Sequence, residues 1–188
     1  MSVKNMSTRG RIVAGAVAVA VAGMVTVGAV SASADQPETP AVAAAAKANA
    51  SDKNVNTVPV LTIEAATKAA EATLSAAEKA GQHVTVAVVD RDGVTRVLLK
   101  GDGAGPQSPE SATRKAFTAV SWNATTSDLA KRAVQAPGLK DIPNTLFLAG
   151  GAPVQSKGAP IAGIGVAGAP SGDQDEQFAQ AGVAAIGG

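Results

Sequence analysis

Apolar residues recur at regular spacing only after about residue 59, and the spacing then switches between helical and strand periods. The first helical pattern places small and aliphatic residues on one face: Ile63, Ala66, Ala70, Leu74 and Ala77. Thr62 precedes it as a helix N-cap, Glu64 favours the positive end of the helix dipole, and Gly81 ends it. The sequence therefore predicts a helix whose small alanines pack closely against a sheet.

Two runs rich in β-branched residues follow, from His83 to Asp90 and from Val94 to Lys100. Arg91-Asp92-Gly93 separates them, and Asp-Gly between such runs is a strong hairpin signal. We therefore expect a β-hairpin, with His83 at the start of its first strand.

Two more helices are expected after a loop rich in glycine and aspartate. Ser108 is the expected N-cap of the first, Pro109 suits its first helical position, and Glu110 favours the dipole. This helix runs to about Trp122. A shorter helix is expected over residues 127–136, begun by a Ser-Asp pair and ended before Pro-Gly.

Three further strands and a last helix complete the pattern. The strands are expected at residues 145–149, 153–155 and 161–167, and the first of them alternates little, which favours a central position. The last helix runs from Asp175 to about Ile186, with Ser171 or Asp173 as its cap. Because hairpins outnumber βαβ crossovers, the predicted fold is α/β, with a five-stranded, mainly antiparallel sheet covered by helices.

A G-x-G-x-x-G match runs from Gly163 to Gly168, but it lies inside an expected strand. Dinucleotide-binding glycines stand between a strand and a helix that opens at once, with an acidic residue roughly 20 positions later. Here Pro170 follows and the chain ends 20 residues after Gly168. We interpret these glycines as positions where a helix or a ligand approaches the strand closely.

The N-terminus resembles a secretory signal peptide over residues 1–34. An uncharged run from Ile12 to Val30 follows three basic residues, and small residues offer a cleavage site at Ala34. The run approaches the roughly 20 residues of a membrane-spanning helix, so an uncleaved anchor is the alternative. We expect a secreted, extracellular protein, with residues 35–58 as a flexible Ala/Pro-rich tether and residues 59–188 as the folded domain.

Charge and cysteine content exclude several classes of protein. The whole chain has a formal net charge of +1. Cleavage would remove Lys4, Arg9 and Arg11 from the 16 basic residues, leaving 13 against 15 acidic ones. A nearly neutral domain is poorly suited to nucleic acid. With no cysteine and one histidine, the chain has no disulfide and no structural zinc site.

Residues with catalytic or metal-binding chemistry are few. His83 is the one histidine, and no serine lies in a nucleophile elbow, so no catalytic residue is predicted. His83 is either a metal ligand or the polar first residue of a strand. Three carboxylates, those of Asp173, Asp175 and Glu176, are candidate ligands for iron or another hard cation, although acidic residues are ordinary in the first turn of a helix.

The segment SATRKAFTAVSWN, residues 111–123, combines aromatic and basic residues on one expected helix. Phe117 and Trp122 lie close in sequence to Arg114 and Lys115. An apolar surface flanked by cations suits a flat hydrophobic ligand that carries carboxylates. The alternative is that the aromatic residues belong to the core and the charges are solvated.

The segments VAVVDRDG, RKAFTAVSW, GGAPV and GIGVAGAP, in this order, resemble the GlcG/HbpS family of haem-binding proteins. The resemblance runs from Leu61 to Gly188 and is nearest to the extracellular HbpS branch. It implies a profilin-like α/β sandwich that assembles into homo-oligomers and binds haem outside the cell. It further implies an accessory role in oxidative-stress sensing beside a membrane histidine kinase of a two-component system.

The resemblance also implies a candidate haem site. Haem iron is usually held by His, Cys, Met or Tyr, and past residue 34 only His83 belongs to that set. A lysine, a threonine hydroxyl, a ligand from a neighbouring subunit, or water are the alternatives. The candidate haem-contacting residues are His83, Thr113, Arg114, Lys115, Phe117, Thr118 and Trp122. We expect non-covalent, reversible binding; the rival functions are haem degradation with iron release and an interaction module without haem.

Overall fold

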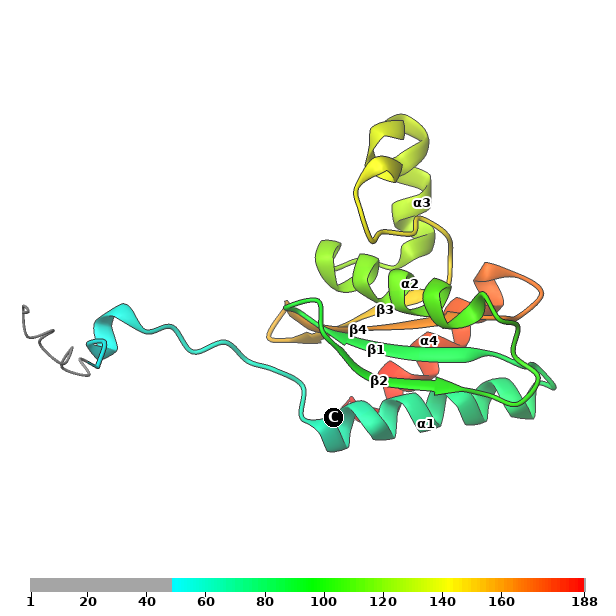
Figure 1. Cartoon of the computed structure of the whole chain (residues 1–188), viewed down its shortest axis with the longest axis horizontal. Helices are drawn as coiled ribbons and strands as arrows, with labels where there is room; N and C mark the ends of the chain where they lie inside the picture. Colours follow the sequence, from blue (N-terminus) through cyan, green and yellow to red (C-terminus); the bar gives the residue numbers. More distant parts are fainter. Residues whose placement is uncertain (1–48, 188) are drawn as a thin grey trace, which may run out of the picture. The chain divides into compact units, whose positions relative to one another are not determined.

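A four-stranded antiparallel sheet forms the centre of the fold in the computed structural model (Figure 1). Its order is β2-β1-β4-β3, with the strands at Thr85–Asp90 (β1), Thr95–Lys100 (β2), Gly151–Ser156 (β3) and Ala159–Ala167 (β4). The structure describes residues 49–187, so the predicted signal peptide and most of the predicted tether lie outside it. Within residues 49–187, no helix is both long and apolar enough to cross a membrane.

Helices cover both faces of this sheet. Helices α1 (Ile63–Lys79) and α4 (Gly172–Ile186) lie side by side on one face, and α2 (Ser108–Trp122) crosses the other (Figure 1). Helix α3 (Thr126–Gln135) and the short 3₁₀ helix η2 (Pro137–Asp141) follow α2, and a second short turn, η1 (Asp52–Asn54), precedes the domain. The α/β class with an antiparallel sheet covered by helices is confirmed.

Strand β1 explains why both faces need a helical cover. All six of its residues are buried, and its apolar side chains alternate between the two faces. Val86 and Val88 join the core formed with α1 and α4, whereas Ala87 and Val89 pack against α2. The predicted hairpin forms, and the Asp90 carboxylate fixes its turn by accepting hydrogen bonds from the backbone of Asp92 and Val94.

Two glycines of the G-x-G-x-x-G match, Gly163 and Gly165, let α2 approach β4. A Cβ atom at Gly163 would collide with the carbonyl oxygen of Ala116, and one at Gly165 with that of Ala112. Both glycines lie within β4. The interpretation of these residues as a close-approach surface, and not as a dinucleotide fingerprint, is therefore confirmed.

The prediction of a strand at residues 145–149, and hence of a sheet with five strands, is wrong. This segment is a loop that bends at Leu148 and Ala149. Side chains of α2 take the backbone groups that a neighbouring strand would have used: Arg114 donates to the carbonyl of Thr145 at 2.7 Å, and the Thr118 hydroxyl accepts from the amide of Leu146 at 2.8 Å. The apolar run serves to bury Phe147 against α2 and α3.

Smaller differences concern the ends of elements. The first helical residue of α2 is Ser108 itself, with Gln107 as N-cap, because the Ser108 hydroxyl bonds to Thr85 at 2.6 Å and does not cap the helix. Helix α3 starts at Thr126 with Thr125 as its cap. Ser171 caps α4 and accepts from the amide of Gln174 at 3.2 Å.

Candidate functional site

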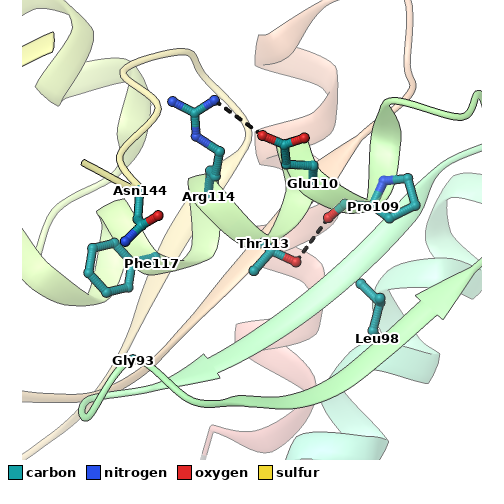
Figure 2. Close-up of a pocket in the computed structure, with 8 residues that line it drawn as sticks. All are labelled: Gly93, Leu98, Pro109, Glu110, Thr113, Arg114, Phe117 and Asn144. Carbon is teal, nitrogen blue, oxygen red and sulfur yellow. Dashed lines mark hydrogen bonds and ion pairs between the residues drawn. The ribbon is translucent and has the colours of Figure 1, made fainter. Parts of the chain in front are cut away.

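A pocket of about 430 Å³ opens between the N-terminal half of α2 and the β1–β2 hairpin (Figure 2). This volume lies within the range of small-molecule sites, roughly 300–1,000 Å³. We call this hollow the α2 pocket, and it is lined by Gly93, Leu98, Pro109, Glu110, Thr113, Arg114, Phe117 and Asn144.

Apolar groups form its floor and one end. Leu98 projects from β2 and remains 46% exposed because no residue of the described chain covers it. Phe117 packs beside the hairpin turn, where a Cβ atom at Gly93 would lie only 3.0 Å from the aromatic ring. Gly93 has a φ of 84°, so the tight turn and the ring both favour glycine there. The pocket therefore offers two apolar side chains, Leu98 and Phe117, near the hairpin turn.

Arg114 brings a positive charge to the other end. Its Nη2 donates to the carbonyl of Thr145 at 2.7 Å, and its Nη1 lies 3.6 Å from the carboxylate of Glu110 (Figure 2). Within residues 49–187, its Nε is buried and has no hydrogen-bond partner. The side chain as a whole is 39% exposed, so its guanidinium can donate charge-assisted hydrogen bonds to the carboxylate of a ligand in the pocket.

The two threonines named from the sequence occupy different positions. Thr113 lines the α2 pocket, and its hydroxyl donates to the carbonyl of Pro109 at 2.9 Å, which leaves lone pairs on the oxygen (Figure 2). Thr118 is fully buried; its hydroxyl donates to the carbonyl of Arg114 at 2.7 Å and accepts from Leu146. Thr113 can reach a ligand in the pocket, whereas Thr118 holds the loop that follows α3.

Lys115 turns away from the α2 pocket into the protein interior. Its Nζ donates to the Asp175 carboxylate and to the carbonyl of Val166, each at 2.8 Å, and its side chain is only 6% exposed. Burial raises the pKa of the Asp175 carboxyl, and the hydrogen bond from Lys115 acts in the opposite direction. The pair ties α2 to α4 and to the end of β4.

The three carboxylates considered as metal ligands do not form a cluster. Asp175 is taken by Lys115, and Glu176 accepts hydrogen bonds from the amide of Ser127 at 2.9 Å and from its hydroxyl at 2.6 Å, at the start of α3. Asp173 is exposed. Across residues 49–187, no group of three or more His, Cys, Asp or Glu side chains is arranged to hold a metal ion.

Trp122 lies at the far end of α2, outside the α2 pocket. Its ring makes an edge-on contact with Phe147, with centroids 5.3 Å apart. It packs against the small cluster of Leu129, Ala133 and Phe147. Of the two aromatic residues on α2, only Phe117 faces the pocket.

His83 lines a separate hollow of about 190 Å³ between α1 and the β1–β2 edge. Its Nδ1 lies 2.7 Å from the carbonyl of Asp102, which fixes the proton on Nδ1 because a carbonyl only accepts. His83 precedes Ala87, the residue opposite Leu98, by four positions, roughly 13 Å along the strand. The two hollows share no residue, so one chain does not bring His83 into the α2 pocket.

The sequence did not identify five residues of the α2 pocket as site residues: Gly93, Leu98, Pro109, Glu110 and Asn144. Glu110 is four residues before Arg114, so an i,i+4 ion pair was available as a signal. Leu98 and Asn144 carry no such signal. They line the pocket because β2 is an edge strand and because the loop after η2 crosses α2.

Comparisons with known proteins identify the family to which this chain belongs. A family model described as "Haem degrading protein HbpS-like" matches residues 61–184, nearly the whole described domain. The chain therefore belongs to the HbpS-like family, and the resemblance found from the sequence is confirmed. A search of the curated proteins finds no match.

Solved structures agree with this assignment. The structure of a double mutant of HbpS from Streptomyces reticuli is 68% identical, with a TM-score of 0.75, and the match covers 77% of this chain and 99% of that one. A structure of HbpS is 69% identical, with a TM-score of 0.74 and coverage of 75% and 100%. A structure of a PduOC complex with haem is 26% identical, with a TM-score of 0.62 and coverage of 68% and 95%.

Proposed function

We propose that the protein binds haem non-covalently and reversibly in the α2 pocket. The observation that carries the proposal is a pocket of about 430 Å³ that combines two apolar side chains, Leu98 and Phe117, with the partly exposed guanidinium of Arg114. Membership of the HbpS-like family and the haem complex of PduOC support the choice of ligand.

The pocket residues fit the chemistry of haem. Phe117 and Leu98 provide an apolar surface for the macrocycle, which gains from ring contact and from burial of apolar area. Arg114 would pair with a propionate through the exposed part of its guanidinium, which can donate charge-assisted hydrogen bonds to a carboxylate. When bound, haem supplies a redox-active iron. The residues of the α2 pocket would orient the haem and partly exclude water from it.

The iron ligand has two candidates among the residues named from the sequence. The Thr113 hydroxyl lies at the pocket, and His83 lies in the separate hollow. Coordination by His83 in the α2 pocket therefore requires a neighbouring copy of the chain. Without a strong ligand from the same chain, we expect the haem to exchange, which suits scavenging or sensing better than permanent retention.

A haemin titration followed at the Soret band tests the proposal. All three hydrophobic clusters lie between Leu61 and Ile186, so protein starting at Asp35 retains the whole folded unit. We expect saturable binding that His83→Ala preserves and Phe117→Ala weakens, with transfer of the haem to excess apomyoglobin. Binding lost in His83→Ala would assign the ligand to a neighbouring copy. The absence of a saturable Soret shift in the unsubstituted protein would overturn the haem proposal.

We further propose that the protein is secreted, forms homo-oligomers, and assists a membrane histidine kinase in sensing haem or oxidative stress. The signal-like sequence of residues 1–34 supports export. N-terminal sequencing of protein recovered from the growth medium tests it: a start at Asp35 is expected, and retention of Met1 on membranes would contradict it. Haemin-dependent autophosphorylation of the kinase, compared with and without this protein, tests the sensing role.

Haem degradation is the second candidate function, and the family description favours it directly. Incubation of the haem complex with a reductant in air distinguishes it from binding alone. Loss of the Soret band together with release of chelatable iron would establish degradation. A spectrum that stays intact over the same period would leave reversible binding as the function.

A further inference from the structure

The α2 pocket contains an acidic residue as well as a basic one. Of the eight lining residues that the structure describes, Glu110 and Arg114 are the charged pair (Figure 2). They lie about one turn apart on α2, and the Glu110 carboxylate is 3.6 Å from Nη1 of Arg114. The Glu110 side chain is 80% exposed. The guanidinium that would bind a ligand carboxylate therefore already faces a carboxylate of the protein.

The Glu110 carboxylate has little part in the packing of the domain. Its separation of 3.6 Å from Arg114 is longer than a hydrogen bond, and an exposed ion pair of this kind contributes little to stability. Glu176 differs, because it is buried and accepts hydrogen bonds from the amide and the hydroxyl of Ser127. Glu110 can therefore exchange its partner without disturbing the contacts that hold α2 on the sheet.

The same carboxylate opposes the entry of an anionic ligand. A ligand carboxylate that pairs with the exposed part of Arg114 takes the donor that Glu110 now faces, and it arrives beside a like charge. The charges of Glu110 and Arg114 also offset each other, so the pocket attracts an anion less than Arg114 alone would. The opposition grows with the number of carboxylates on the ligand, and haem carries two.

We propose that Glu110 is a specificity-determining residue of the α2 pocket, where its carboxylate competes with the carboxylates of the ligand for Arg114. The inference rests on the proposed binding of haem and gives a second reason why that binding is reversible. When a propionate leaves Arg114, the Glu110 carboxylate takes its place, so the guanidinium keeps an anionic neighbour in both states.

A role in helix stability is the rival explanation for Glu110. It lies in the first turn of α2, where the helix dipole favours an acidic residue. Glu64 holds the corresponding place in the first turn of α1, on the opposite face of the sheet, and is also exposed. Glu64→Gln is therefore a matched control, because it makes the same chemical change at a helix start away from the pocket.

Soret titrations with two ligands test the proposal. Haemin carries two ionised propionates, whereas both are neutral in haemin dimethyl ester; the two are compared in one buffer with mild detergent. We expect Glu110→Gln to bind haemin roughly two- to fivefold more tightly and to release it more slowly to excess apomyoglobin. Its affinity for the ester should be unchanged, and Glu64→Gln should match the unsubstituted protein with both ligands.

Two results would overturn the proposal. Unchanged or weaker haemin binding by Glu110→Gln would leave only the helix-stabilising role, which urea denataturation of Glu110→Gln and Glu64→Gln would show as similar losses. An equal gain with haemin and with the ester would mean that Glu110 acts through pocket shape and not through charge.

Arg114→Gln separates competition for the guanidinium from simple repulsion of the ligand. In a chain that carries Arg114→Gln, the further change Glu110→Gln should improve haemin affinity less, because no guanidinium remains to compete for. An equal improvement in both backgrounds would contradict competition. The gain should also shrink between about 0.01 M and about 1 M salt, where the screening length falls from roughly 30 to roughly 3 Å.

The same titrations distinguish failure of this inference from failure of the proposed function. If the unsubstituted protein gives no saturable Soret shift with haemin, the haem proposal fails and the role of Glu110 fails with it. If it binds haemin and Glu110→Gln binds it no more tightly, only the role of Glu110 fails.

Discussion

Arg114 and Lys115 are neighbouring cations on α2 that face opposite environments. The Arg114 side chain is 39% exposed at the α2 pocket and has one buried nitrogen without a partner in the described chain. The Lys115 side chain is 6% exposed and bonded at 2.8 Å to both Asp175 and the carbonyl of Val166. One position apart on a helix is a rotation of about 100°, enough to separate a binding group from a structural one.

The comparison shows that charge next to aromatic residues is not by itself a binding signal. A buried cation with all its partners in place belongs to the fold, whereas a partly exposed cation beside a pocket is available to a ligand. The following substitutions test whether the two roles separate as the geometry indicates.

The largest effect is expected for Lys115→Met. Removing one partner of a buried ion pair costs about 3–5 kcal/mol, because the other charge is left unpaired. We therefore expect the free energy of unfolding to fall by about that amount in urea denaturation, with the haemin affinity of the remaining folded protein unchanged. A variant as stable as the unsubstituted protein would mean that the pair contributes no net stability.

The stability loss in Lys115→Met should depend on pH. Burial raises the pKa of the Asp175 carboxyl, and loss of Lys115 removes the hydrogen bond that opposes this shift. A carboxyl whose pKa is higher in the folded state binds more protons when folded, so stability rises as pH falls through the folded pKa. Urea denaturation at about pH 8 and about pH 5 should show a smaller deficit at the lower pH. An equal deficit at both would contradict the role of Asp175.

Arg114→Gln should act on the ligand more than on the fold. It removes the charge while keeping a polar side chain of similar length, and loss of one charge-assisted contact corresponds to about a tenfold weaker haemin affinity. Stability should fall by about 0.5–1.5 kcal/mol through the lost hydrogen bond to the carbonyl of Thr145, because the ion pair with Glu110 is exposed and contributes little. Unchanged haemin affinity in this variant would mean that Arg114 does not contribute to haem binding.

The smallest effect is expected for Trp122→Phe. This change trims the edge-on contact with Phe147, so a loss of about 0.5–1.5 kcal/mol is expected in thermal or urea unfolding. Haemin affinity should stay the same, since Trp122 lies outside the α2 pocket. A clear loss of haemin affinity would mean that Trp122 contributes to haem binding, contrary to its position outside the α2 pocket.

Most of the elements could be predicted from local signals. The cap at Thr62, the hairpin turn at Gly93 and the terminal helix capped by Ser171 depend on residues close in sequence, and they occur as expected. The prediction of a strand at residues 145–149 was wrong because the hydrogen-bond partners of this segment, Arg114 and Thr118, lie about 30 positions earlier in the chain. Strand propensity does not reveal that distant side chains will take the backbone hydrogen bonds.

Only part of the candidate site could be predicted, because the rest again depends on residues that are distant in sequence. The helix with Thr113, Arg114 and Phe117 could be found from composition, but the directions of Lys115, Thr118 and Trp122 depend on where α4, the loop after η2 and α3 pack. The placement of His83 away from these residues likewise follows from the sheet, which puts the start of β1 beside β2 and α1.

The sequence by itself determined the helices, the hairpin, the close-approach glycines and the family, because these depend on short-range periodicity, turn chemistry and motifs. Tertiary structure alone decided that the sheet has four strands, that Arg114 borders a pocket while Lys115 is buried, and that Leu148 is exposed. Burial and hydrogen-bond satisfaction are set by residues far apart in the chain, so they become definite only when the helices pack on the sheet.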